Sequence, residues 1–96
     1  MTSFEKAVAI AVKSIKDDAL MCGVEWNRVL DWADLLDWMG TDSAGMREDI
    51  HHDLMRAANM GNLDVYPMDN CSIEDTDGTI KSYRQLTNAI RKELFA

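Results

Sequence analysis

Residues 75–80 (DTDGTI) place two aspartates at a spacing close to that of a calcium-binding loop. If these aspartates occupy positions 3 and 5 of an EF-hand loop, positions 1 and 12 fall on Ile73 and Arg84. The leading carboxylate and the bidentate glutamate that hold Ca²⁺ are therefore missing. We expect a polar turn here that caps a following helix, and no metal site.

His51 and His52 are the only histidines of the chain. Adjacent residues of an α-helix point about 100° apart, and no second histidine lies four residues away, so a shared metal ion is not expected. Two histidines on a solvent-exposed surface are predicted instead. The sequence also has no glycine-rich phosphate loop, no Ser/His/Asp set and no paired-carboxylate motif. We therefore predict no catalytic residues and no cofactor, which indicates that the chain is not an enzyme.

The two cysteines, Cys22 and Cys71, are expected to be reduced thiols. Cys22 falls on the apolar face of a predicted helix, which favours burial, and Cys71 falls in a polar loop without a neighbouring base. Small secreted domains usually carry four or more cysteines, and residues 1–6 do not resemble the start of a secretion signal. No apolar run approaches the ~20 residues that cross a bilayer. We expect a cytoplasmic protein without a membrane partner.

Charge is the most informative feature of the sequence. The chain has 17 acidic and 10 basic residues, a net charge of −7, and 15 of the acidic residues lie within residues 17–79 together with only three of the basic ones. Like charges three or four residues apart on a helix cost a few tenths of a kcal/mol per pair, so folding gains nothing from them. The candidate partner-binding carboxylates are Asp31, Asp34, Asp37, Glu48, Asp49, Asp53, Asp64, Asp69, Glu74, Asp75 and Asp77.

Two interpretations of this acidic segment stay open. It can be a solvated surface that keeps a small protein soluble. Alternatively, it can occupy a groove that another protein uses for nucleic acid, because carboxylates on successive helical turns, ~5.4 Å apart, can satisfy phosphate-binding Lys and Arg side chains. The same negative field disfavours direct binding of DNA or RNA.

Apolar residues at steps of three and four predict a helical chain. A capping box at Thr2 opens the first helix, and glycines end the first three. We predict one all-α domain over residues 1–96, a small bundle of about four helices. The predicted elements are helices at 3–22, 24–39, 41 or 43 to 60 and about 79–95, with a short extended segment at 63–66.

The tryptophans offer a second route to binding. Apolar residues cover most of the circumference of predicted helix 24–39, which is typical of a central helix or of one that shares a face with a partner. Trp26, Trp32 and Trp38 can simply fill the core. Trp32 or Trp38 can also form a homodimer or partner contact, since aromatic residues are enriched at interfaces. The alternative function is therefore an acidic helical adaptor or regulator with a Trp/Met-rich binding face.

The C-terminal half resembles small acidic bacteriophage proteins. The resemblance rests on residues 49–58 (DIHHDLMRAA), residues 61–65 (GNLDV), an acidic loop, and residues 88–94 (NAIRKEL). Ocr-like antirestriction proteins, which mimic DNA, and anti-CRISPR proteins are similar in size and charge. The resemblance implies a non-enzymatic inhibitor of a host nucleic-acid-binding defence protein. The phosphate stand-ins that it implies are Asp49, Asp53, Asp64, Asp69, Glu74, Asp75 and Asp77.

The target of such an inhibitor stays open between two kinds of defence protein. The last predicted helix is basic at Arg91 and Lys92, and no long acidic tail follows it in this sequence. Both features differ from the antirestriction pattern. A Cas effector is therefore as good a candidate partner as a restriction enzyme.

Overall fold

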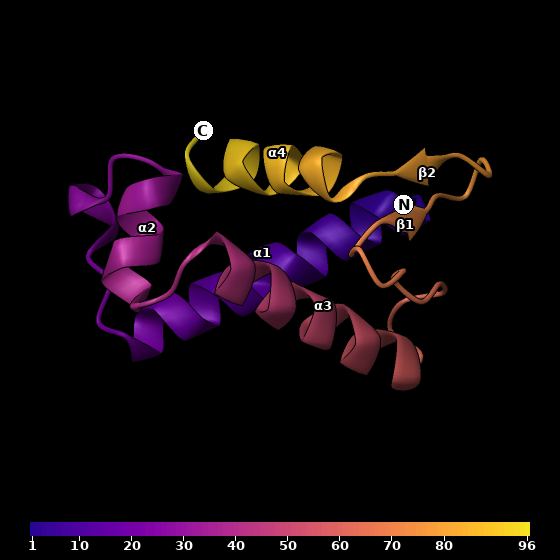
Figure 1. Ribbon diagram of the computed structural model, residues 1–96, viewed down its shortest axis with the longest axis horizontal. Helices are drawn as coiled ribbons and strands as arrows, with labels where there is room; N and C mark the ends of the chain where they lie inside the picture. Colours follow the sequence, from indigo (N-terminus) through magenta and orange to yellow (C-terminus); the bar gives the residue numbers. More distant parts are fainter.

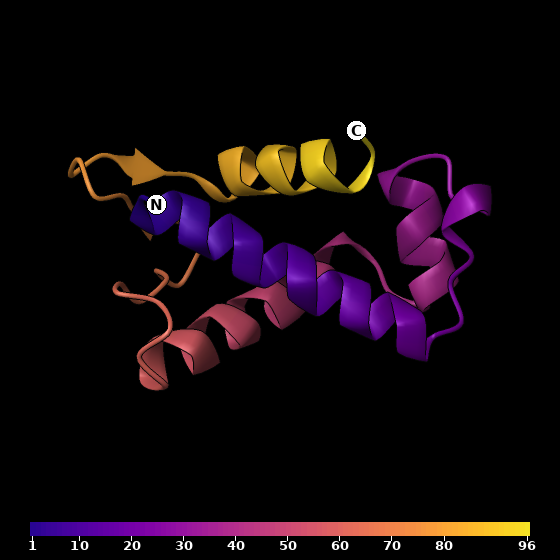
Figure 2. The same ribbon diagram turned by 180° about the vertical axis from the view of Figure 1, so that it is seen from behind.

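The first helix, α1 (Ser3–Met21), runs through the centre of the structure, a computed structural model that describes residues 1–96. Helices α3 and α4 and strand β1 pack along it, and α2 contacts its C-terminal part (Figures 1 and 2). The molecule measures 38 × 23 × 23 Å. The remaining elements are η1 (Trp26–Arg28), α2 (Trp32–Met39), α3 (Ser43–Asn59), β1 (Ile73–Glu74), β2 (Ile80–Lys81) and α4 (Tyr83–Leu94).

Helix α1 forms because its sequence combines a capping box with an apolar stripe. The Thr2 hydroxyl accepts a hydrogen bond from the Glu5 amide, and the Glu5 carboxylate accepts one from the Thr2 amide. Small and β-branched residues form the stripe, and three alanines, Ala7, Ala11 and Ala19, are fully buried. Small side chains on α1 let its neighbours pack close to its backbone. The prediction of about four helices is confirmed, and the chain is mostly helical, but the predicted all-α class leaves out a two-stranded sheet of β1 and β2.

The second predicted helix, 24–39, is wrong in its first half. A short 3₁₀ turn, η1, is followed by extended residues, and α2 starts only at Trp32. The Asp31 carboxylate accepts a hydrogen bond from the Asp34 amide at 2.9 Å, and the Asp34 carboxylate accepts one from the Leu30 amide at 3.0 Å. The two carboxylates thus accept hydrogen bonds from backbone amides that a continuous helix would pair with backbone carbonyls. Asp residues commonly act in this way at the start of a helix.

The extended segment is also displaced from its predicted place. Residues 63–66 form bends and irregular backbone, whereas β1 and β2 make a two-stranded antiparallel hairpin that pairs Ile73 with Lys81. Helix α4 consequently begins at Tyr83, after a capping box at Ser82, and not near residue 79. The polar turn predicted at 75–80 therefore joins two strands and does not cap a helix.

The hairpin turn is fastened to the start of α1. The Asp75 carboxylate accepts hydrogen bonds from the amides of Phe4 at 3.0 Å and Thr76 at 2.8 Å. The Ser3 amide donates to the Thr76 hydroxyl at 2.8 Å, and the Ser3 hydroxyl donates to Asp64 at 3.0 Å. The three bonds donated by Ser3 and Phe4 join segments more than 60 residues apart and place residues 60–79 beside the N-terminus (Figure 1).

The core lies between α1 and the elements around it. Every other α-helix and the hairpin supply at least one fully buried side chain, among them Leu35, Leu54, Ile73 and Leu86. None of the four α-helices is both long and apolar enough to span a bilayer.

We expect Asp75→Asn to lower the melting temperature by roughly 5 °C at pH 7 and to have little effect in acid. The Phe4 amide, foremost among its hydrogen-bond donors, lowers the pKa of Asp75 below its usual 3.8. A carboxyl with a lowered folded-state pKa stabilises the fold above its unfolded pKa, and this stabilisation is lost as the pH falls through the folded pKa. The difference in melting temperature between Asp75→Asn and wild type should therefore shrink below about pH 4. Thermal melts followed by circular dichroism from pH 7 to pH 2 measure it.

Asp69→Asn is the matched control for this experiment. Asp69 is exposed in the same loop and makes no hydrogen bond, so its melting curve should follow wild type. A difference between Asp75→Asn and wild type that stays constant with pH would contradict the role of the ionised carboxylate.

Candidate functional site: an acidic surface on the third helix

The eleven predicted carboxylates lie in three separate groups. Three belong to α2 and its N-cap, three to α3, and five to residues 60–79. Helix α2 and the hairpin occupy opposite ends of the long axis, and α3 lies between them (Figure 1). The predicted residues therefore do not form one compact patch, and each group has to be judged by what its side chains contact.

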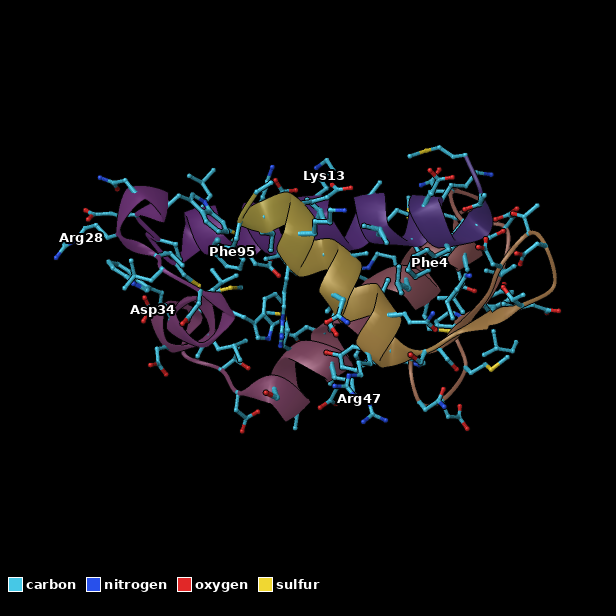
Figure 3. All side chains as sticks on the ribbon, turned by 90° about the horizontal axis from the view of Figure 1, so that it is seen from above. Phe4, Lys13, Arg28, Asp34, Arg47 and Phe95 are labelled. Carbon is cyan, nitrogen blue, oxygen red and sulfur yellow. The ribbon has the colours of Figure 1, made fainter.

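The α2 group is mostly used by the fold. The carboxylates of Asp31 and Asp34 hold the start of α2 through hydrogen bonds to backbone amides. Figure 3 shows Asp34 on this helix, away from α3. Only Asp37 is exposed without such a bond. If a capping carboxylate formed an ion pair with a partner protein, it would lose hydrogen bonds that stabilise the start of its helix.

The loop group is also partly used by the fold. Asp75 is only 9% exposed, so its prediction as a surface phosphate stand-in is wrong. The Ser3 hydroxyl lowers the pKa of Asp64, and the Thr79 hydroxyl lowers the pKa of Asp77, because each donates a hydrogen bond to the carboxylate. Of this group, Asp69 and Glu74 are exposed and make no hydrogen bond or ion pair.

The α3 group keeps two of its three carboxylates available. Glu48 and Asp49 are exposed and unpaired. Asp53 is partly buried between α3 and α1, and this burial is the main reason that its pKa is raised, with repulsion from Asp18 and Asp49 as a smaller contribution. The Ser14 hydroxyl and the guanidinium of Arg56, which lies 4.0 Å from Asp53, act in the opposite direction. The carboxylates of Asp18, Asp49 and Asp53 are therefore close enough to repel one another.

Two hollows extend the α3 group onto neighbouring segments. One hollow, of about 270 Å³, is lined by Glu48, His51 and Asp69 together with Arg47. Another, of about 250 Å³, is lined by Asp18 and Asp49. We call the resulting set of five carboxylates the α3 acidic surface: Asp18, Glu48, Asp49, Asp53 and Asp69.

Few cations offset this surface. The Arg47 guanidinium is stacked over the Tyr83 ring of α4, 5.5 Å from its centroid, and Figure 3 shows it on the α4 side of α3. Arg56 is the only other base on α3. The bases Lys81, Arg84, Arg91 and Lys92 lie on β2 and α4, along the opposite edge of the molecule from α3 in Figure 1. Charge is thus divided between an acidic and a basic side.

The cysteines and histidines do not make a reactive site. Cys22 is exposed and not buried as predicted, because it follows the last turn of α1. Cys71 is fully buried, and this burial raises its pKa to about 11. His52 is exposed as predicted, whereas His51 is partly buried and its Nδ1 has no hydrogen-bond partner. No three His, Cys, Asp or Glu side chains are arranged to hold a metal ion.

The tryptophans differ in their availability. Trp32 is only 8% exposed, and the Arg91 guanidinium lies over its ring at 5.0 Å from the centroid. Trp32 is therefore not accessible for the predicted homodimer contact through Trp32 or Trp38, which stays a prediction for Trp38 alone. Trp38 is 37% exposed, with Arg28 6.0 Å from its ring centroid.

The chain finds no match among protein-family models, curated proteins or solved structures. A function is therefore inferred from the geometry and charge of its own residues.

We expect Asp53→Asn to raise the melting temperature by roughly 1–4 °C at pH 7. Because the pKa of Asp53 is raised in the folded state, its ionised form destabilises the fold, and wild type regains this stability as the pH falls through that pKa. The gain of the variant should therefore disappear in acid. Thermal melts at pH 7 and pH 4 measure it, with the exposed Asp37→Asn as control. A lower melting temperature at pH 7 would mean that Ser14 and Arg56 outweigh the crowding.

Proposed function

We propose that this protein is a non-enzymatic inhibitor that binds a host nucleic-acid-binding defence protein, either a Cas effector or a restriction enzyme. The α3 acidic surface would take the place of nucleic-acid phosphates in the groove of that partner. The observation that carries the proposal is that carboxylates from α1, α3 and the loop 60–79 line the two hollows beside α3, where Arg47 is the one base in the lining. Repulsion from Asp18 and Asp49 contributes to the raised pKa of Asp53, after its burial. Such repulsion does not help folding, so a role in binding is a reason for its presence.

Helical geometry suits such a surface to a phosphate-binding groove. Asp49 and Asp53 are one turn apart on α3, a rise of about 6 Å for four residues. Duplex DNA carries about one charge per 1.7 Å of axis, and a groove built for it presents rows of Lys and Arg. Carboxylates pair with guanidinium groups through short charge-assisted hydrogen bonds, often two at a time. Complementary charge would also speed the encounter of the two proteins.

The proposed surface is narrower than the one inferred from the sequence. The carboxylates that cap α2 or fasten the hairpin are left out because the fold already uses them. Asp18 is added, since it lies beside Asp49. We place the action of the inhibitor in the cytoplasm of a bacterial host, without direct contact to nucleic acid or membrane.

The adaptor alternative has less support. The exposed methionines Met1, Met21, Met60 and Met68 lie at the two ends of α1, at the end of α3 and in the loop that follows. They do not gather into one face, and Trp32 is buried. A Trp/Met-rich binding face is therefore not formed as that alternative requires.

The test removes three carboxylates of the α3 acidic surface and compares them with three elsewhere. The test variant is Asp18→Asn/Glu48→Gln/Asp49→Asn, and the control is Glu25→Gln/Asp37→Asn/Glu93→Gln, all at exposed positions with the same change of net charge. Each purified protein is added to a restriction nuclease and to a guide-loaded Cas nuclease, and DNA cleavage is measured. We expect wild type and control to inhibit one of these enzymes, and the test variant to lose inhibition by about tenfold or more.

Salt and competition separate mimicry from other modes of inhibition. Raising the salt to about 0.5 M should weaken the complex steeply, because exposed charges carry it. Non-cleavable duplex DNA should displace the protein from the enzyme. Equal loss of inhibition by the control variant, or inhibition that survives in the test variant, would exclude the α3 acidic surface as the binding site.

A further inference from the structure

A second surface, separate from the α3 acidic surface, contains an apolar hollow beside the C-terminal half of α1. This hollow, of about 670 Å³, lies between the C-terminal half of α1, the η1 turn and the end of α4. Figure 3 shows Phe95 at this end of α4, beside α1. The apolar residues that line it are Leu20, Trp26, Val29, Leu30, Leu94 and Phe95.

A neighbouring hollow continues the apolar lining along α4. Its volume is about 520 Å³, and it shares Leu30 and Phe95 with the first hollow. Trp32 and Arg91 lie on its other side. We call the two hollows together the apolar groove.

The exposure of its side chains marks the apolar groove as unpartnered. Leu20 is 78% exposed and Leu30 is 83% exposed, and they line the same hollow as the rings of Trp26 and Phe95, whose centroids are 6.4 Å apart. A single exposed leucine on a protein surface is ordinary. Two of them beside half-buried aromatic rings, in one concave site, form the kind of lining that receives an apolar side chain.

Basic side chains outnumber acidic ones around the apolar groove. Lys16, Arg91 and Lys92 line it and form no ion pair, although the Arg91 guanidinium is stacked over the Trp32 ring. The lining also holds two acidic side chains: Asp17 pairs with Lys13 at 2.7 Å, and Asp31 caps α2 and keeps its charge. In a chain with a net charge of −7, a groove with more basic than acidic side chains is an exception.

We propose that the apolar groove binds an acidic amphipathic helix of another protein. Apolar side chains at helical spacing would enter the hollows beside Leu20 and Leu30, and flanking Asp or Glu would meet Lys16 and Lys92. This site goes beyond the proposed inhibitory function, because a basic nucleic-acid groove would be repelled here. A convex helix fits a concave groove better than a flat bilayer does.

A second copy of this chain does not supply such a helix. The apolar stripe of each of its four α-helices lies in the core, so none of them presents a complete free apolar face. We therefore assign the helix to a different protein, and sedimentation tests the second copy as the occupant.

The test uses the full-length protein and a labelled synthetic peptide. The peptide has about 15 residues, with Leu at positions i, i+3, i+4 and i+7 of each repeat and Glu on both flanks. A second peptide carries Lys in place of every Glu. Fluorescence anisotropy should show that the acidic peptide binds at least about tenfold more tightly than the basic one.

Matched variants locate the binding site. Leu20→Ser/Leu30→Ser should weaken binding of the acidic peptide about tenfold, whereas Met21→Ser/Met60→Ser, equally exposed but outside the groove, should not. Lys16→Gln/Lys92→Gln should weaken it severalfold, and the control Lys81→Gln/Arg84→Gln should leave it unchanged.

Three results would overturn the proposal. The first is equal affinity for the acidic and basic peptides, and the second is unchanged affinity in Leu20→Ser/Leu30→Ser. The third is a different occupant of the groove. Phosphatidylserine vesicles that displace the peptide would indicate a membrane surface, and a dimer in sedimentation that Leu30→Ser dissociates would indicate a second copy of this chain. Neither groove variant, Leu20→Ser/Leu30→Ser or Lys16→Gln/Lys92→Gln, changes a residue that lines the hollows of the α3 acidic surface, so inhibition of a nuclease can fail or succeed independently.

Discussion

The close packing of other elements against a small-residue stripe on α1 is the constraint on which the structure depends. Ala7, Ala11 and Ala19 are fully buried, and α1 contacts each of the other three α-helices and the hairpin. Its N-terminus is held by the hairpin turn through Asp75. Because α2, α3, α4 and the hairpin all pack against α1, the α3 acidic surface and the apolar groove both include residues on or beside α1.

The division of charge between α3 and α4 follows from this arrangement. Both helices bury their apolar residues toward the common core, so their polar residues face outward on different sides. The exposed charged residues of α3 have both signs (Arg47, Glu48, Asp49 and Arg56), and those of α4 are mainly basic (Arg84, Arg91 and Lys92, with Glu93). Mixed signs on α3 allow a favourable pair, since Asp53 lies 4.0 Å from Arg56. Repulsion from Asp18 and Asp49 nevertheless adds to the burial that raises the pKa of Asp53.

Short sequence patterns predict the ends of α1 and α3 well. Features that depend on contacts between distant segments cannot be predicted in this way. The capping box of α1 and the start of α3 are visible as short patterns. The helix starts only at Trp32 because the carboxylates of Asp31 and Asp34 accept hydrogen bonds from nearby backbone amides. The spacing of apolar residues gives no information about such hydrogen bonds. In the same way, Asp49 and Asp53 are recognisable as neighbours on one helix, but Asp18 joins them only because α1 packs against α3. Leu30 falls within the predicted helix 24–39 and is exposed, because the first half of that helix does not form.

One turn of α1 contributes to both proposed binding surfaces. Lys16, Asp17 and Leu20 line the apolar groove, whereas Asp18 lines the acidic hollow with Asp49. Successive helical residues point about 100° apart, so neighbours in the sequence reach opposite sides of the helix. An α-helix fixed by packing on several sides is a rigid spacer and not a two-state element, and energetic coupling between sites needs such an element. Two partners bound at these surfaces would therefore be held in a fixed relative orientation without altering the affinity of each other.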